Sequence, residues 1–270
     1  MNDNIIDIKS LIDSKNRSCK SWEKHNFLFK KLSKVILLKP NELRSNYKDI
    51  LLLSADAGEA LTEISKINCN RIVFLSPYLK LLERDNSKTK KIFKINGHFE
   101  SLPLKNEKFD LIVSNLYLHT INKKEIHLKN IFNLLNENGL LICNFFAENS
   151  LRELKHSLYL TDEKIFGGVF VRLPSNHTMI EICELLSLVG FKELVSEKIN
   201  YQIHYNHVLD LLKDIKGTGE NNLLTKRKKG LMTMNYINEL NRQYKRNFGN
   251  SDGLLATCDV VSISCWKPLV

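Results

Sequence analysis

Short apolar runs alternate with helical stretches from Asp49 onward, and this alternation constrains the fold more than any other feature of the chain. The apolar runs have the length of strands and are almost uninterrupted, which is typical of strands buried on both faces. We expect strands at 50–55, 72–75, 92–95, 109–114 and 140–146, and helices at 60–67, 79–84 and 125–135. Strands that alternate with helices predict a mostly parallel sheet covered by helices on both faces.

After Asn149 the alternation loosens. We expect helices at 151–160 and 179–189, strands at 191–199 and 256–266, and a helical insertion at about 207–248. Gly190 directly follows the second of these helices, where glycine is the usual C-cap. Two final strands that flank an insertion suit a seven-stranded sheet with one antiparallel edge strand. The predicted fold class is therefore α/β and Rossmann-like, with N-terminal helices and a helical insertion before the last strand.

The first 48 residues stand apart from this pattern. Apolar residues recur at a mostly helical spacing between residues 22 and 38, which predicts an amphipathic leader helix. We therefore expect a helical leader at 1–48 and a second domain at 49–270. The start of the chain has no basic segment followed by an apolar one, and no apolar run approaches the roughly 18 residues that span a bilayer. The sequence predicts a cytoplasmic protein without a membrane span.

The cysteines show no spacing that would seat a metal ion. The chain has six cysteines but no C-x-x-C pair, and zinc sites typically take ligands from such pairs. Cys143 and Cys183 lie inside apolar runs, where a thiol is usually a small buried hydrophobe. We expect reduced thiols and no metal site.

The formal net charge of +10, from 40 Lys and Arg against 30 Asp and Glu, raises the question of a nucleic-acid or acidic partner. The densest positive run is Lys226-Arg227-Lys228-Lys229, and it lacks the interleaved aromatic residues of single-strand binders. Lys, Asn and Ile are abundant throughout the chain, which favours a compositional bias. An RNA-interacting protein is therefore a third reading, and nucleic acid is not the expected partner.

Several short motifs along the chain together resemble those of a known group. They are HNFL at 25–28, LPL at 102–104, FDLIVSN at 109–115, LYLH at 116–119, NGLLI at 138–142, SLREL at 150–154, GG at 167–168, GF at 190–191, KGTGENN at 216–222, AT at 256–257 and WKP at 266–268. The series resembles the class I S-adenosylmethionine-dependent methyltransferases, within them the group of the biotin-pathway malonyl-carrier-protein methyltransferase and mitochondrial complex I assembly factor 5. The resemblance covers nearly the whole chain. It implies the class I methyltransferase fold, S-adenosylmethionine as cofactor and a respiratory complex I subunit as partner.

The first signature of the implied cofactor site is a glycine loop, acid-x-Gly-x-Gly-x-Gly, after the first strand, where such sheets bind their ligands. Its acid falls on Leu52 and its three glycines on Ser54, Asp56 and Gly58, so only the last glycine is retained. The chain is short of glycine overall, with 11 in 270 residues, about 4% against roughly 7% in average usage. Asp56 places a carboxylate where the resemblance expects that of the cofactor, and like charges repel.

The other two signatures of the family are carboxylates, and both are absent. The acid that accepts the ribose hydroxyls falls on Ser76, and the acid near the adenine falls on Gly97 or His98. A hydrogen bond to a charged group contributes about 1.5–3 kcal/mol, so two losses amount to about 3–6 kcal/mol, or roughly 10²–10⁴ in affinity. We expect weak or absent cofactor binding; a shifted loop that binds in another way is the alternative. The candidate cofactor positions are Ser54, Asp56, Gly58, Ser76, His98 and Asn115.

Three polar residues are candidates for catalysis. Asn115 ends the fourth strand, where this fold often presents substrate-side groups, and His119 follows one helical turn later. The resemblance places Glu220, in the 217–222 loop, over the active-site mouth. The alternatives are a structural histidine at a strand-helix turn and an ordinary loop between helices. Arg172 is either a bidentate clamp for an acidic group or a surface arginine.

The resemblance implies a role in respiratory complex I assembly, and the activity proposed in that group is hydroxylation of an arginine on a complex I subunit. Because the cofactor loop departs from the family pattern, a pseudoenzyme with a binding or chaperone role is the leading reading of the chemistry. The competing reading is an active methyltransferase that acts on a carrier-linked or other small carboxylic acid. The sequence leaves the oligomeric state open.

Overall fold

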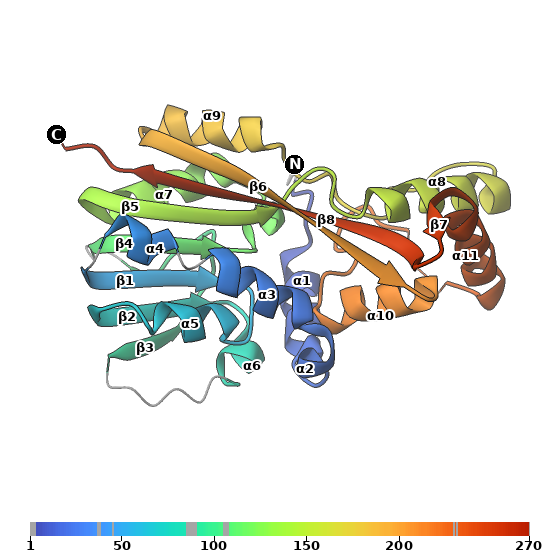
Figure 1. Cartoon of the computed structure of the whole chain (residues 1–270), viewed down its shortest axis with the longest axis horizontal. Helices are drawn as coiled ribbons and strands as arrows, with labels where there is room; N and C mark the ends of the chain where they lie inside the picture. Colours follow the sequence, from blue (N-terminus) through green and yellow to red (C-terminus); the bar gives the residue numbers. More distant parts are fainter. Residues whose placement is uncertain are drawn as a thin grey trace. The chain divides into compact units, whose positions relative to one another are not determined.

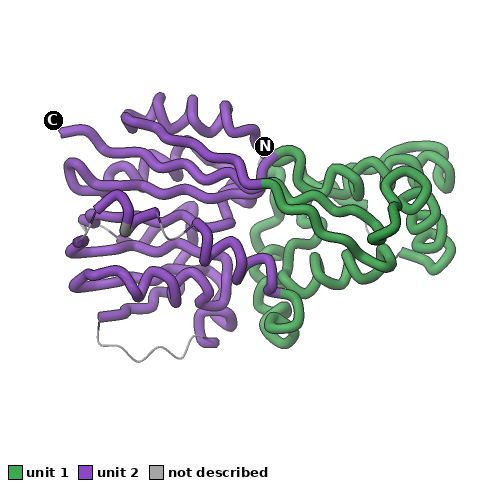
Figure 2. Tube along the Cα trace, viewed as in Figure 1, with its two compact units in different colours: residues 1–25, 148–176, 200–259 green, residues 26–147, 177–199, 260–270 purple. Residues whose placement is uncertain are grey.

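The computed structural model describes residues 4–36, 39–44, 46–84, 91–104, 108–228, 230 and 232–269. The chain divides into two compact units (Figure 2). Unit 1 contains residues 1–25, 148–176 and 200–259, and unit 2 contains residues 26–147, 177–199 and 260–270. The predicted boundary after residue 48 stays a prediction.

Unit 2 is built on a mostly parallel sheet (Figure 1). Its strands are β1 (Tyr47–Ser54), β2 (Cys69–Ser76), β3 (Ile92–Asn96), β4 (Phe109–Asn115) and β5 (Leu135–Phe146), while β6 (Lys192–Tyr205) and β8 (Gly253–Trp266) contribute residues to both units. The strand order is β3-β2-β1-β4-β5-β8-β6, and the two-residue β7 (Gly249–Asn250) pairs with β8. Strand β8 runs antiparallel to β5, and the pairs from β3 to β5 are parallel. The predicted α/β sheet with an antiparallel strand toward one edge is confirmed.

The central strands are apolar runs because both of their faces are covered. The four residues Ile50 to Leu53 of β1 are each 0% exposed, and β4 shows the same burial from Leu111 to Val113. Helices α3 and α5 pack together, as do α7 and α9. The helices of unit 2 are α3 (Phe27–Ile36), α4 (Lys39–Leu43), α5 (Glu59–Ile64), α6 (Leu79–Leu82), the 3₁₀ turn η1 (Leu118–Thr120), α7 (Lys124–Leu134) and α9 (Met179–Val189).

Helix α9 begins and ends at the predicted residues. The Thr178 side chain accepts a hydrogen bond from the Glu181 amide, and the Glu181 side chain bonds back to the Thr178 amide, which completes a capping box. Gly190 takes the left-handed conformation at the C-cap with φ 116°. Both ends are therefore specified by local residues.

Unit 1 has its own hydrophobic core. Its helices are α1 (Ile8–Ser18), α2 (Trp22–His25), α8 (Arg152–Phe166), α10 (Val208–Gly217) and α11 (Met234–Phe248). Apolar side chains from α8, α10 and α11 meet at Leu154, Val208 and Leu240. The helical insertion predicted at 207–248 corresponds to α10, α11 and the segment between them.

One prediction for the N-terminal segment is wrong. The expected single helix over 22–38 is broken, because Asn26 separates α2 from α3 and its side-chain amide donates to Glu59 Oε1 at 2.6 Å. Residues 37 and 38, at its predicted end, lie outside the described residues. Helix α1 lies within the predicted helical leader, but its bounds were not predicted, because its residues are mostly polar; Asp7 caps it by accepting from the Ser10 amide at 3.0 Å.

The Asn138-Gly139 pair lies inside β5, which begins five residues earlier than the strand predicted at 140–146. Asn138 has φ 55°, and the β4–β5 register shifts between Phe109 and Leu111. The pair therefore forms an irregularity within a longer strand, where a left-handed residue is accommodated. In the described part of the chain, no helix is long and apolar enough to cross a bilayer.

Candidate functional site

The carboxyl ends of β1, β4 and β5 bring three polar side chains into one row. Ser54 is paired with Asn115, and Asn115 with Asn144, in the parallel register of these strands. All three residues are 0% exposed. The order of the sheet reverses between β1 and β4, which is where open α/β sheets bind their ligands. The candidate site therefore lies at this edge of unit 2.

Asp56 sits at the centre of this row and its carboxylate points into the protein. Its Oδ2 accepts from Ser54 Oγ at 2.7 Å, from the Asn115 side-chain amide at 3.1 Å and from the Ala60 backbone amide at 3.2 Å. Its Oδ1 accepts from the Gly58 backbone amide at 2.9 Å. The residue is 0% exposed. The loop that follows β1 is thus closed around its own carboxylate.

The environment of Asp56 disfavours its ionised form. Burial, and after it the nearby Glu59 carboxylate, raise the pKa of Asp56 to about 6, although the hydrogen bonds from Gly58, Ser54 and Ala60 oppose the shift. Glu59 Oε2 accepts from the Ala57 amide at 2.9 Å. The sequence predicted that the Asp56 carboxylate would repel the carboxylate of a bound cofactor. In the structure the Asp56 carboxylate instead accepts hydrogen bonds from its own loop.

Asn144 links this cluster to β5. Its side-chain amide donates to Asn115 Oδ1 at 3.2 Å, while the Asn115 amide also donates to Ser54 Oγ at 3.2 Å. Asn144 and Glu59 were not among the predicted site residues, and neither was Asn26, which donates to Glu59. An isolated asparagine at the end of the apolar strand β5 was the available signal for Asn144. Asn115 is thus a connector between Asp56 and Asn144.

Aromatic rings pack together beyond the ends of β2, β3 and β4. Phe99 stacks on Tyr117 with ring centroids 3.8 Å apart, and Tyr78 contacts Phe99 edge-on at 6.0 Å. These three residues are at most 3% exposed. This cluster was not predicted, because its members come from three separate turns.

The buried histidine next to these rings is neutral. Burial lowers the pKa of His127 to about 4, although its bond with the Phe99 carbonyl favours the charged form. His127 Nδ1 lies 2.7 Å from that carbonyl oxygen and Nε2 lies 2.8 Å from the Tyr117 hydroxyl. A neutral ring satisfies both contacts when Nδ1–H donates to Phe99 and Nε2 accepts from Tyr117.

The ribose and adenine positions inferred from the resemblance carry no carboxylate. Ser76 is 0% exposed, and its Oγ lies 3.4 Å from the Tyr78 amide, which donates to it. His98 is exposed and its carbonyl accepts from the Ser101 amide. With Asp56 turned inward as well, these residues do not fit S-adenosylmethionine in the manner of the family.

The candidate catalytic residues lie in different parts of the chain. Asn115 is buried in the polar row of unit 2, whereas His119 is half-buried in η1 and packs edge-on against Phe146 at 5.2 Å. Glu220 belongs to unit 1, where it pairs with the fully buried Lys15 at 2.5 Å. Glu220 thus holds the 217–222 loop against α1.

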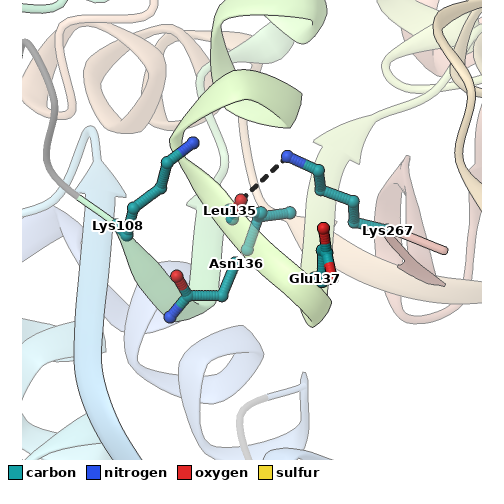
Figure 3. Close-up of a pocket in the computed structure, with 5 residues that line it drawn as sticks. All are labelled: Lys108, Leu135, Asn136, Glu137 and Lys267. Atoms are coloured by element: carbon teal, nitrogen blue, oxygen red, sulfur yellow. Dashed lines mark hydrogen bonds between the residues drawn. The ribbon is translucent and has the colours of Figure 1, made fainter. Parts of the chain in front are cut away.

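A surface hollow of about 450 Å³ lies at the amino end of β5, with Lys108, Leu135, Asn136, Glu137 and Lys267 around it (Figure 3). Its lysines are bound to the end of α7. Lys267 Nζ donates to the Leu135 carbonyl at 3.0 Å, and Lys108 Nζ donates to the Asn133 carbonyl at 2.5 Å. Cations are favourable at a helix C-terminus, so both lysines stabilise α7. Among the described residues, no three His, Cys, Asp or Glu side chains gather as a metal site would require.

Comparisons with known proteins agree with this architecture. Residues 54–143 match the methyltransferase domain family. The chain is 31% identical over 170 residues to the mitochondrial arginine-hydroxylase NDUFAF5 of Danio rerio, covering 63% of this chain and 53% of that protein. It thus spans about half the length of that relative. It is 24% identical over 227 residues to the malonyl-[acyl-carrier protein] O-methyltransferase of Nitrosospira multiformis, covering 84% of this chain and 71% of that protein.

A solved structure, the YcgJ protein of Bacillus subtilis, superposes with a TM-score of 0.60 at 16% identity, covering 88% of this chain and 99% of that chain. At this identity the match concerns the fold alone. The strand order, the match over residues 54–143 and these relatives lead to one conclusion. The chain is a relative of the class I S-adenosylmethionine-dependent methyltransferases.

Proposed function

We propose that this protein acts in the assembly of respiratory complex I and binds S-adenosylmethionine weakly or not at all. The observation that carries the cofactor part is the inward-turned carboxylate of Asp56, with four hydrogen bonds to its own loop and to Asn115. The assembly part rests on the similarity to NDUFAF5. The two parts are independent and are tested separately.

The magnitude of the lost contacts supports weak binding. Two missing charge-assisted hydrogen bonds, at the positions of Ser76 and His98, correspond to about 3–6 kcal/mol. That loss is a factor of roughly 10²–10⁴ in affinity. Release of the Gly58 and Ala60 amides from Asp56 would add a further cost before any ligand could use them.

A protein that does not hold the cofactor would work through its surface. We infer that it binds a complex I subunit and acts as a pseudoenzyme in the cytoplasm. The buried row of Ser54, Asp56 and Asn115 then serves to fix the turn after β1. The alternative within the same assembly role is an enzyme that hydroxylates an arginine of that subunit, the activity given in the name of NDUFAF5.

The assembly role is tested by deleting the gene in a host that makes complex I. We expect less assembled complex I on native gels and restoration by the intact chain. Restoration should persist with the Ser76→Ala variant, because the proposal assigns no cofactor contact to that side chain. Normal complex I in the deletion strain contradicts the assembly role and leaves the cofactor claim untouched.

A second candidate is an active methyltransferase on a carrier-linked carboxylic acid. It is favoured by the match to the malonyl-[acyl-carrier protein] O-methyltransferase, which covers 84% of this chain. This reading predicts transfer of a labelled methyl group from S-adenosylmethionine to a malonyl carrier protein. We expect no transfer above the no-enzyme level, and transfer that rises with enzyme concentration would favour this second candidate.

A further inference from the structure

Unit 1 carries an exposed apolar surface at the end of α8. Four large side chains contribute to it: Phe166, Val169, Phe170 and Val171, which are 44%, 49%, 38% and 67% exposed. Phe166 ends α8, and the other three follow the Gly167-Gly168 turn outside any helix or strand. We call these four residues the loop face. Contiguous exposed apolar side chains often mark an interaction site.

One buried carboxylate fixes the backbone beneath the loop face. Asp162 of α8 is 0% exposed, and Arg172 donates to it with Nη2 at 2.6 Å and Nε at 2.8 Å. The Tyr236 hydroxyl donates to Asp162 at 2.8 Å and the Phe170 amide at 3.3 Å. The bidentate clamp considered for Arg172 is therefore formed with the chain's own acid. A surface that is already ordered loses little conformational freedom on binding.

A lysine side chain places a positive charge on the loop face. Lys228 Nζ lies 3.0 Å from the ring centroid of Phe166 and 4.1 Å from that of Phe170, which is a cation–π arrangement. Lys226 is exposed two residues earlier. Within the described ranges, neither ammonium group forms an ion pair. Lys229, the last residue of the predicted basic run, lies outside the described residues.

We propose that the loop face is the docking surface for a partner-protein segment that carries a carboxylate among apolar side chains. Its apolar side chains would cover Val169, Phe170 and Val171, and its carboxylate would pair with Lys228. Charge complementarity selects an acidic partner over a second copy of this chain, because two molecules of formal charge +10 repel each other. The loop face is remote in sequence from the residues of the cofactor proposal and does not depend on it.

The test measures the binding of short fluorescein-labelled peptides by anisotropy. The three probes alternate leucine with glutamate, leucine with lysine, and serine with glutamate. We expect the leucine–glutamate peptide to bind at least about tenfold more tightly than either of the others. Val169→Ser combined with Val171→Ser, and Lys228→Glu separately, should each weaken it by about tenfold. If the double variant melts at a lower temperature than the wild type, the single variant Val171→Ser replaces it in the binding measurement.

The matched control is Ile180→Ser combined with Leu188→Ser, which removes two side chains that are 65% and 72% exposed on α9. This control should leave binding unchanged. The proposal is overturned by no binding of the leucine–glutamate peptide, by equal binding of all three peptides, or by an equal loss in the control. Binding to phosphatidylcholine–phosphatidylglycerol vesicles without any peptide binding also overturns it, in favour of a membrane surface.

Discussion

The side-chain amide of Asn115 donates a hydrogen bond to the buried carboxylate of Asp56 at 3.1 Å, across the boundary between β4 and the loop after β1. This contact joins the position of the family's glycine loop to the end of β4. It explains how a carboxylate persists at a position where the family has glycine. The carboxylate binds its own loop and leaves no part of itself exposed.

Replacing Asn115 with alanine should destabilise the protein by about 1–3 kcal/mol, because Asp56 and Ser54 lose a buried donor. The free energy of unfolding in urea, measured at neutral pH, checks this. Asn247→Ala is the control, since Asn247 is exposed and donates only to the Gln243 carbonyl among the described residues. We expect a change within about 0.5 kcal/mol for the control. An equal loss in both variants would contradict the role given to Asn115.

The stability contribution of Asp56 should fall as the pH rises. Its pKa is raised from 3.8 to about 6 in the folded protein, so the folded state binds more protons than the unfolded state in this window. The contribution is complete below pH 3.8 and is lost as the pH rises through about 6. Asp56→Asn cannot titrate, so its stability relative to the wild type should rise between pH 4 and 7.

Asp110→Asn provides a control of opposite sign. Burial opposes the shift, but hydrogen bonds from the Asn136 side chain and the Lys48 and Asp49 amides lower the pKa of Asp110. Its contribution is therefore present above the unfolded pKa of 3.8 and is lost at lower pH. Relative to the wild type, the free energies of unfolding of Asp56→Asn and Asp110→Asn should therefore change in opposite directions as the pH rises. Parallel changes in the two variants would rule out the inward-facing carboxylate of Asp56.

His127 should stay neutral down to a pH well below that of an ordinary histidine. Its pKa is lowered from 6.5 to about 4, so its stability contribution is present above pH 6.5 and is lost as the pH falls through about 4. Nitrogen chemical shifts of the labelled imidazole would report the midpoint. A midpoint for His127 near the ordinary histidine value of 6.5 would show that the ring is not held between Phe99 and Tyr117.

Adding a methyl group at Gly217 should loosen α10 from the N-terminal helices. A Cβ atom there would overlap with the ring of His25, whose Nδ1 lies 2.6 Å from Asp214. Overpacking of this kind costs about 1–3 kcal/mol. Gly168→Ala is the matched control, because a Cβ atom at Gly168 meets nothing within 4 Å. We expect faster hydrogen exchange in α1 and α2 for Gly217→Ala but not for Gly168→Ala. Unchanged exchange in Gly217→Ala would contradict the close contact between Gly217 and His25.

The sheet and several helices could be predicted because their signals are local. The strands of the sheet are continuous apolar runs, and α9 carries its own capping box and Gly190. The bounds of α1 within the helical leader were not predicted, because its buried face includes Lys15, whose charge is matched by Glu220 in a segment 205 residues away. A pairing of that separation leaves no periodic pattern in the sequence.

The candidate site was located by sequence, but its internal arrangement was not. The departures at Ser54, Asp56 and Ser76 are visible from the residues alone. The direction of the Asp56 side chain is not, because it depends on donors from Asn115 and from the start of α5. The same holds for the packed rings beyond the strand ends, which come together only when β2, β3 and β4 align.

Isothermal titration of the unaltered chain with S-adenosylhomocysteine tests the central claim most directly. The ligand carries the adenine, ribose and carboxylate that the family recognises, so its affinity reports on all three altered positions together. The inward-turned Asp56 and the absent carboxylates at Ser76 and His98 predict no saturable heat in the low-micromolar range. Saturable binding with a low-micromolar dissociation constant would contradict the account.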